Sequence, residues 1–442
     1  MLNRRQYRWT ELRLLLPPSL FMLLGLFELL KVNSTEPITR DTLPPLAAFT
    51  PAIGLIAALF AAHLALCFIA PDADQTLLPL AGMLSSIGVV MSMRFGLPDV
   101  QPTPHPDLGS KQLVFVIAGL VFCVATVWAT RDLRWLRNFK YTWAAAGIVL
   151  VGITLARAHS FSTNAPSRDV LTIGSGGFSM QPSEILKVCL VIFFAGYLSE
   201  NREMLAAAFY RLGPLKLPPL KHLGPLLAML GIALLIFVGV RELGLALLIF
   251  GLFLSLLYVA SNRPMYVIGS VVAFVLGAWI AFHIFSYAAM RLQIVGSAFD
   301  DPLGYGYQII QGLISYANGG VLGAGLGQGK PWITPAAWTD YMPASFGEEF
   351  GFAGLLALFG LFMLLVYRGM HIATRARNPF NQLLAVGLTS VFALQTLVIL
   401  AGNLNVMPLT GVPLPFVAYG GSSLLANFII IGLLLRVSMA DA

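Results

Sequence analysis

The chain has 442 residues, of which 57% are hydrophobic and only 11% charged, and its formal net charge is +7. Typical soluble domains carry about 25% charged residues, so the composition excludes a soluble globular protein and indicates a polytopic membrane protein. The positive charge requires no nucleic-acid partner, because it gathers in loops where anionic membrane lipids would attract it.

Apolar runs divide the chain into about twelve predicted transmembrane helices, at about 20 residues per bilayer crossing. The expected ranges are 12–30, 47–70, 77–95, 113–130, 141–156, 184–198, 225–240, 243–260, 265–287, 350–367, 383–401 and 414–435. The predicted fold class is therefore an all-α polytopic membrane protein. An even number of crossings places both termini on one side.

The distribution of positive charge predicts the orientation. If the N-terminus is cytoplasmic, most of the 27 lysines and arginines fall in inner segments. Inner loops of membrane proteins carry this excess. We therefore expect a multi-pass protein of the cytoplasmic membrane with both termini in the cytoplasm.

A short polar link, ProAspAlaAspGln at residues 71–75, follows the first two predicted helices. It predicts a boundary between an accessory N-terminal two-helix hairpin, residues 1–75, and a ten-helix membrane domain, residues 76–442.

Glu184 and Lys187 are spaced three residues apart on a predicted helix and would share one face. An ionised side chain deep in a bilayer costs about 2.5 to 3.5 kcal/mol on insertion scales, so such residues usually pair inside the protein. We expect an internal ion pair, which acts either as a structural staple between helices or as part of a polar substrate cavity.

The long polar stretch from residue 301 to 351 cannot cross a bilayer as a lipid-exposed helix. The orientation places it in a large outer loop, residues 288–349, between the ninth and tenth helices. Asp340 lies there between aromatic residues, where partial desolvation would raise its pKa and suit it to act as a general base. Capping of the following turn is the alternative. Glu348 and Glu349 precede the helix predicted from residue 350, which favours capping for this pair.

Glycines recur through residues 319–329 without the spacing of a Walker motif. They permit either a re-entrant turn or backbone amides that face a pyrophosphate. Lys330 and Arg291 would add positive charge to such an anion site.

The segment from residue 402 to 423 combines prolines with glycines. Pro413 and Pro415 are predicted to open the last helix, and the glycines at 420 and 421 to interrupt it. Tyr419, Ser422 and Ser423 would then lie near freed backbone polar groups. The interruption is either a packing kink or the lining of a polar site.

These residues together resemble the SEDS family (shape, elongation, division and sporulation), which includes RodA and FtsW. The resemblance covers roughly residue 77 to the C-terminus. Its motifs are GlnProSerGlu at 181–184 with Lys187, GluLeuGly at 242–244, AspProLeuGlyTyrGlyTyrGln at 301–308, ThrAsp at 339–340, GlyGluGluPheGly at 347–351 and LeuProPheValAlaTyrGlyGlySerSer at 414–423. The resemblance implies a ten-helix core and a peptidoglycan glycosyltransferase that polymerises lipid II on the outer face of the bacterial cytoplasmic membrane.

The family has an essential outer-loop aspartate, whose position Asp340 occupies. As the implied general base, it would activate the acceptor sugar hydroxyl, and undecaprenyl pyrophosphate would leave with inversion. The negative charge of the leaving pyrophosphate would need cations nearby. Lysine or arginine side chains, or a divalent cation such as Mg²⁺ or Mn²⁺, would supply that charge. Trp338 stands where the family usually has histidine. The candidate substrate-binding residues are Glu184, Lys187, Arg168, Arg291, Lys330, Gln308, Thr339, Tyr419, Ser422 and Ser423.

The resemblance also implies a partner, a single-span class B penicillin-binding protein that crosslinks the new strands, besides lipid II and membrane lipids. Two other functions stay open on the sequence. The intramembrane Glu184 and Lys187 favour a lipid II transporter, and the replaced histidine favours a non-catalytic scaffold of a cell-wall synthase.

Overall fold

A computed structural model describes residues 8–32, 44–97, 107–161, 171–173, 178–206, 210–212, 215–217, 220–284, 286–304 and 306–440. Ten helical stretches within these ranges are long and apolar enough to cross a membrane, and two further apolar stretches, Lys140–Ala156 and Gly224–Val240, are shorter. The predicted all-α membrane fold is confirmed. The count of about twelve crossings stays a prediction.

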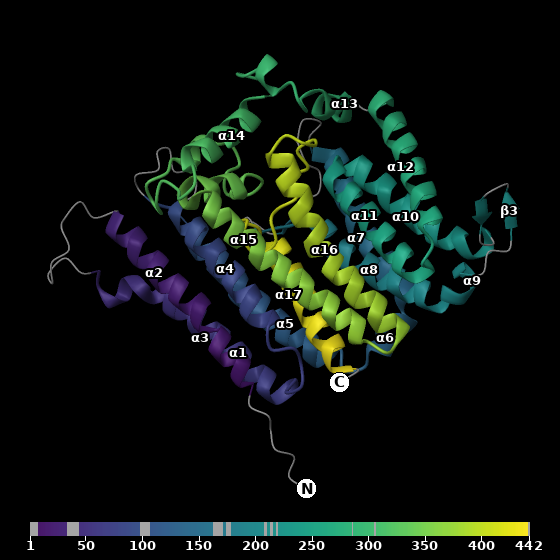
Figure 1. The fold of residues 1–442 in the computed structure, drawn as a ribbon, viewed down its shortest axis with the longest axis horizontal. Helices are drawn as coiled ribbons and strands as arrows, with labels where there is room; N and C mark the ends of the chain where they lie inside the picture. The colour runs from purple at the N-terminus through teal and green to yellow at the C-terminus, as the bar shows by residue number, and fades with distance from the viewer. Residues whose placement is uncertain are drawn as a thin grey trace, which may run out of the picture.

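The long helices lie side by side in one bundle (Figure 1). They are α2 (Leu16–Val32), α3 (Thr50–Ile69), α4 (Leu77–Arg94), α5 (Leu108–Ala129), α7 (Lys140–Phe161), α8 (Pro182–Glu200), α10 (Leu220–Val240), α11 (Leu243–Ser261), α12 (Pro264–Ile284), α15 (Met342–Arg375), α16 (Pro379–Asn403) and α17 (Gly421–Ala440). Helices α4 and α8 are the most buried. Helix α17 packs on α5, α15 on α16, and α7 on α8.

Short elements cover the two ends of the bundle. They are α1 (Trp9–Leu14), η2 (Leu46–Phe49), α6 (Leu133–Asn138), α9 (Arg202–Ala206), α13 (Ser286–Gln293), η3 (Ala298–Asp300), α14 (Tyr307–Gly319) and η4 (Pro331–Ile333). Two antiparallel hairpins pair β1 (Leu171–Ile173) with β2 (Phe178–Met180) and β3 (Tyr210–Leu212) with β4 (Leu215–Leu217). Helices α13 and α14 lie at one end of the bundle, and α1 and the C-terminal end of α17 lie at the other (Figure 1).

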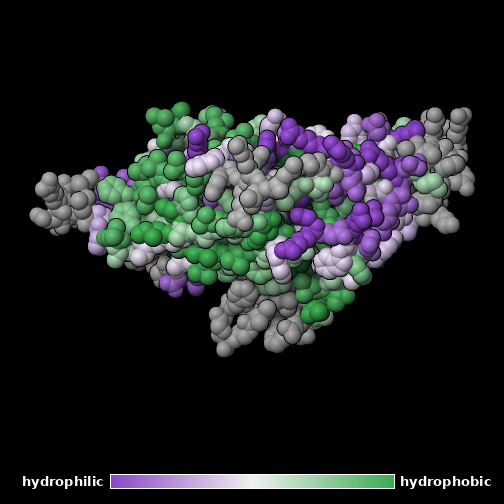
Figure 2. Space-filling view, turned by 90° about the horizontal axis from the view of Figure 1, so that it is seen from below, coloured by the Kyte–Doolittle hydropathy of each residue, from purple (hydrophilic) through white to green (hydrophobic). Residues whose placement is uncertain are grey.

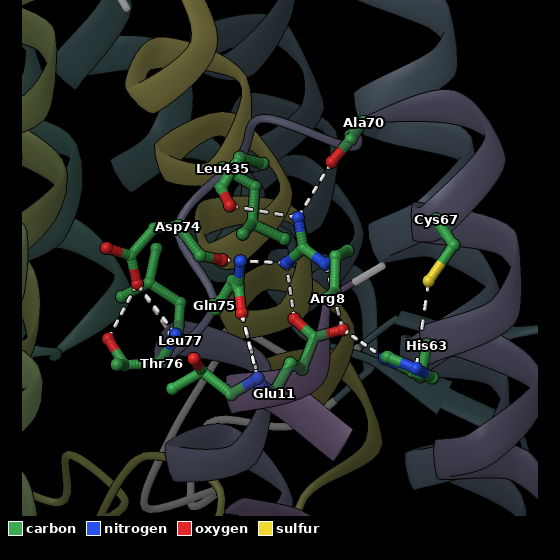
Figure 3. A network of polar contacts seen from close by, with 12 residues as sticks. Arg8, Glu11, His63, Cys67, Ala70, Asp74, Gln75, Thr76, Leu77 and Leu435 are labelled. Atoms are coloured by element: carbon green, nitrogen blue, oxygen red, sulfur yellow. Dashed lines mark hydrogen bonds and ion pairs between the residues drawn. The ribbon is translucent and has the colours of Figure 1, made fainter. Parts of the chain in front are cut away.

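A buried polar network joins the first helices to the rest of the bundle (Figure 3). Arg8 pairs with Glu11, and its Nη1 donates to the carbonyls of Ala70 at 2.7 Å and Ala73 at 2.9 Å. His63 Nδ1 lies 2.7 Å from Glu11 Oε1. The predicted polar link at residues 71–75 is thus held by the side chain of Arg8, just before α1, and by backbone N–H groups of α1 that donate to Gln75, and the domain boundary there stays a prediction.

Asp74 extends this connection to the far end of the chain. Its backbone N–H donates to Ser438 Oγ of α17 over 2.9 Å, and its carboxylate pairs with Arg368 of α15. Helix α2 packs along α4 and α3 along α5. The N-terminal helices are therefore packed on the remaining bundle along their length.

One predicted helix start is confirmed and another is wrong. Helix α15 consists of two helical segments that meet at a kink at Gly351, whose φ is 68°; the apolar segment begins near residue 350 as predicted, and an unpredicted segment from Met342 precedes it. Helix α17 begins only at Gly421, because the preceding apolar run from residue 408 is irregular backbone. Pro413 and Pro415 cannot donate helical hydrogen bonds, and Gly411 and Phe416 have positive φ angles of 69° and 64°.

Candidate active site

Asp340 occupies a tight turn just before α15. The N–H groups of Thr339 and Tyr341 both donate to the carbonyl of Ala336 at 3.1 Å. The carbonyl of Asp340 accepts a 2.9 Å hydrogen bond from Asn403 Nδ2, at the end of α16. The turn that presents Asp340 is therefore fastened to a long helix of the bundle.

The Asp340 side chain is half-buried. Burial raises the pKa of Asp340 above its ordinary value, and the positive charge of Arg291 and a hydrogen bond with Thr339 partly oppose that rise. A Cβ atom built on Gly411 would lie 3.8 Å from Asp340 Oδ2. The irregular segment before α17 therefore passes beside the carboxyl group.

A cavity of about 1090 Å³ lies between α10, α11 and α12 and extends to residues 407–410, which directly precede Gly411. Its wall is mainly apolar and includes Leu234, Phe250 and Phe274. Arg291 and Leu409 form part of the same wall, and Arg291 Nη1 donates to the Leu409 carbonyl over 3.3 Å. The arginine that acts electrostatically on Asp340 thus also lines the apolar cavity.

Trp338 fastens the other side of the turn. Its carbonyl accepts a 2.8 Å hydrogen bond from the N–H of Tyr419, and its ring meets Phe95 edge-on with centroids 6.1 Å apart. Trp338 therefore packs against the residue that follows α4, and its carbonyl holds the backbone of Tyr419. Tyr419, predicted near freed backbone groups, makes its contact through its own N–H.

The glycine-rich segment at residues 319–329 is a re-entrant turn against α15. The N–H groups of Ala324 and Gly325 donate to the carbonyls of Glu348 and Glu349 at 2.9 and 3.0 Å. Arg94 Nη2 donates to the carbonyls of Gly327 and Gly329 at 3.0 and 3.1 Å. Of the two alternatives, this geometry supports the turn.

The capping role predicted for Glu348 and Glu349 is wrong. Both residues lie inside α15 ahead of its kink, and both are buried. Glu349 pairs with Arg94, while Glu348 Oε1 accepts the backbone N–H of Lys330 over 3.0 Å. The two carboxylates therefore hold the glycine-rich segment. The Lys330 side chain itself is exposed.

Glu184 and Lys187 form the predicted internal ion pair, with Nζ 2.6 Å from Oε2 and both side chains almost completely buried. Lys187 Nζ also donates to Gln395 Oε1 of α16 over 3.2 Å. Gln395 precedes Asn403 by eight residues on α16, which corresponds to about 12 Å along the helix. The ion pair thus lies deeper in the bundle than the Asp340 turn, and its burial supports the staple.

The remaining predicted site residues divide into three cases. Gln308 Nε2 donates to the carbonyl of Pro335 over 3.1 Å, which supports the turn ahead of Asp340. Ser422 Oγ accepts the N–H of Gln181 at 2.9 Å, and Ser423 Oγ accepts from Asn427 at 3.3 Å, so both serines are engaged in packing α17. Arg168 lies outside the described residues.

The donor set around Asp340 does not fit a protein-held metal ion. In the described part of the chain, no three His, Cys, Asp or Glu side chains gather as a metal site would require. Arg291, the charged residue acting on Asp340, cannot be a ligand. The expectation of a divalent cation, Mg²⁺ or Mn²⁺, stays a prediction.

Four residues that shape this region were not singled out in the sequence. Asn403 and Gly411 fix the surroundings of Asp340, Gln395 completes the ion pair, and Arg94 is the buried partner of Glu349. Gln395 interrupts an apolar run and Arg94 ends one, so the rule that intramembrane polar residues carry a role would have identified both. No local pattern distinguishes Asn403 or Gly411.

Comparison with known proteins places these features in a family. The profile of the FtsW, RodA and SpoVE family, described as cell cycle protein, matches residues 75–442. The peptidoglycan glycosyltransferase RodA of Mycobacterium tuberculosis is 37% identical over 379 residues, covering 85% of this chain and 80% of the relative. A probable peptidoglycan glycosyltransferase FtsW of Geobacter metallireducens is 30% identical over 372 residues, covering 83% of this chain and 94% of the relative.

Solved structures share the fold. A chain from a peptidoglycan synthase complex, described as coordinating polymerization and crosslinking, superposes with a TM-score of 0.64 at 23% identity, covering 83% of this chain and 97% of the other. The rod shape determining protein RodA of Thermus thermophilus gives a TM-score of 0.57 at 20% identity, covering 84% and 97%. At these identities the likeness concerns the fold alone.

Proposed function

The chain belongs to the FtsW, RodA and SpoVE family, and from this premise we propose that it is a peptidoglycan glycosyltransferase that polymerises lipid II into glycan strands. The names of its relatives support the reaction class. The observation that carries the proposal is that Asp340 is half-buried and lies within the electrostatic reach of Arg291, which itself lines an apolar cavity.

Asp340 acts as the general base in this proposal. Its carboxylate takes the proton from the acceptor sugar hydroxyl while that oxygen forms a bond to the anomeric carbon of the donor. The bond from the anomeric carbon to the pyrophosphate oxygen breaks, the electron pair leaves with undecaprenyl pyrophosphate, and the configuration inverts. The raised pKa of Asp340 supports this role, because a base accepts a proton best when its pKa lies near the working pH.

The cavity supports lipid II as the substrate class. An apolar volume of about 1090 Å³ suits a polyisoprenoid chain, and ligand pockets usually measure about 300–1000 Å³. Arg291 lies in its wall and carries positive charge toward the Asp340 turn. In this proposal Arg291 stabilises the pyrophosphate as negative charge develops on the leaving group.

Two further parts of the proposal concern the orientation of the chain in the membrane and its protein partner. The excess of cations in inner segments, together with α1 and the end of α17 at one end of the bundle, supports cytoplasmic termini and an outward-facing Asp340. The fold shared with a chain of a peptidoglycan synthase complex supports a partner, for which we propose a class B penicillin-binding protein. No contact in the described residues favours a transporter, since the Glu184 and Lys187 pair is closed off from solvent.

The test is a polymerisation assay. Purified full chain is incubated with lipid II, with and without the partner and with and without a chelator of divalent cations, and glycan strands are separated by electrophoresis. Asp340→Asn is expected to lower the rate about 10²- to 10⁴-fold, the usual contribution of a general base. The matched control is Asp300→Asn, an exposed carboxylate of the same loop, which is expected to polymerise normally.

Two results would overturn the proposal. One is undiminished glycan product from a correctly folded Asp340→Asn protein, which would exclude Asp340 as the general base. The other is no product from the wild-type chain under any condition, which would leave a scaffold role.

A further inference from the structure

A second cavity, which is polar, lies at the opposite end of the bundle from Asp340. It has a volume of about 360 Å³ and is formed where α5, α6, α16 and α17 end or begin. Four arginines line it, with a single carboxylate among the lining residues: Arg131, Arg134, Arg137, Arg436 and Asp132. The cavity is therefore strongly cationic.

The arginines of this cavity lack charged partners. Among the residues that the structure describes, none of the four forms an ion pair, and the Asp132 side chain accepts the backbone N–H of Arg134 over 2.9 Å. The Nε atoms of Arg137 and Arg436 are buried and have no hydrogen-bond partner within the described part of the chain. A buried guanidinium donor without an acceptor is costly, so the cavity is built for an anion that supplies acceptors.

Two of the four arginines, Arg131 and Arg436, are also held in place. Arg436 Nη2 donates to the carbonyl of Arg131, which ties the end of α17 to the turn after α5. The Arg131 guanidinium lies over the Trp128 ring, 5.6 Å from its centroid. Asn378 caps α16 through Phe380 N–H on the opposite wall. A preorganised cluster of this kind loses less entropy on binding than free surface side chains do.

Aromatic residues beside the cavity indicate the depth at which it lies. The exposed fractions of Trp128, Trp135, Phe139 and Tyr141 are 56%, 47%, 50% and 50%. Exposed tryptophan and tyrosine rings gather where the headgroups of a membrane meet water. Figure 2 shows hydrophilic residues gathered over one side of this face of the molecule. The cavity thus lies level with lipid headgroups rather than out in solution.

We propose that this cavity is a binding site for a phosphate group, and that the phosphate belongs to the headgroup of an anionic phospholipid. Arginine binds phosphate through paired N–H donors, and basic pockets between transmembrane helices are suited to phosphorylated headgroups. The site is separate from the Asp340 region and does not rest on the proposed activity. It would fasten α6 and the ends of α16 and α17 to one leaflet.

The experiment measures lipid binding to the full chain. Protein purified in a neutral detergent is titrated with short-chain phosphatidylglycerol, with phosphatidylcholine, with inorganic phosphate and with an acidic peptide, and bound species are counted by native mass spectrometry. Wild type is expected to retain phosphatidylglycerol and not phosphatidylcholine. Arg137→Gln combined with Arg436→Gln is expected to weaken binding at least about tenfold, because both unsatisfied donors are lost.

Matched variants make the result specific. Arg13→Gln removes an exposed arginine of α1 from the same end of the bundle, outside the cavity, and is expected to leave binding unchanged. Arg137→Lys keeps the charge and is expected to recover part of the affinity. If the double variant does not fold, as its unfolding midpoint would show, the exposed Arg134→Gln replaces it.

Four outcomes would overturn the proposal: equal retention of both lipids, unchanged binding by the cavity variants, displacement of the lipid by inorganic phosphate at equal concentration, and equal binding of an acidic peptide. The third would assign the site to free phosphate, and the fourth to a protein segment.

Discussion

Arg94 Nε donates to Glu349 Oε1 over 2.9 Å, and both side chains are completely buried. The pair joins the end of α4 to the part of α15 just before its kink. Arg94 also holds the carbonyls of Gly327 and Gly329. One buried cation thus fixes the glycine-rich segment and the helix that follows Asp340.

Removing one member of this pair is expected to destabilise the protein. Arg94→Gln leaves Glu349 as a buried carboxylate without its counter-charge, and such a change typically costs about 3–5 kcal/mol. The measurement is thermal unfolding in detergent. Arg375→Gln, at the exposed far end of α15, is the control and should leave the midpoint nearly unchanged. Equal midpoints for the two variants would mean that the pair does not stabilise the fold.

The raised pKa of Asp340 predicts the pH dependence of polymerisation. Only the carboxylate form accepts a proton, so the rate should fall as the pH drops through the raised pKa, which lies above the ordinary aspartate value of 3.8. Arg291 lowers that pKa, so Arg291→Gln is expected to raise it further and shift the acidic limb to higher pH. The measurement is the initial rate against pH.

Arg291→Lys keeps a positive charge and serves as the control for this shift. Its acidic limb is expected to stay close to that of the wild type. An acidic limb near the ordinary aspartate value, or one that Arg291→Gln leaves in place, would show that Asp340 does not control the rate.

The sequence predicts helices well where they are apolar, and poorly where contacts with distant residues determine whether a polar segment is helical. The run ending at Arg94 is recognisable as a helix, and α4 covers it almost residue for residue. The start of α15 at Met342 is hidden, because Glu348 and Glu349 make its first turns look like a polar loop. Their burial depends on Arg94, which lies 255 residues away in the chain.

For the segment before α17 the error is the opposite one, because a helix is predicted where the backbone is irregular. It is apolar enough to look helical, yet Gly88 of α4 packs directly against the carbonyls of Phe416 and Val417. Gln112 Nε2 of α5 donates to the carbonyl of Ala418 over 3.2 Å. Neighbouring helices thus satisfy an irregular backbone that the local sequence alone would place in a helix. Family motifs single out Asp340, but not the Asn403 and Gly411 that fix its surroundings.

Gly411 offers a direct test of those surroundings. Its φ of 69° is a left-handed conformation that costs a residue with a Cβ about 1–2 kcal/mol, and its Cβ position is 3.8 Å from Asp340 Oδ2. Gly411→Ala is expected to lower the polymerisation rate about 10- to 100-fold by displacing the segment beside the base. Gly360→Ala, in α15 with no atom within 4 Å of its Cβ position, is the control and should polymerise normally. A Gly411→Ala enzyme as active as the control would show that the segment does not position the base.

For the ion pair of Glu184 and Lys187, replacing both residues is expected to destabilise the protein less than replacing one. Lys187→Met leaves Glu184 buried with no counter-charge and is expected to cost about 3–5 kcal/mol, whereas replacing both residues by methionine removes both charges and is expected to cost much less. The unfolding midpoints of the single and double variants measure the difference.

Polymerisation by the double variant then separates the two roles left open for the pair. A structural staple predicts that a folded double variant keeps most of its activity, since the pair lies about 12 Å along α16 from the Asn403 contact that holds the Asp340 turn. If the pair instead takes part in substrate binding, the double variant should fold, but its polymerisation rate should fall strongly and its apparent KM for lipid II should rise. The burial of both side chains and the hydrogen bond from Lys187 to Gln395 lead us to expect the first result.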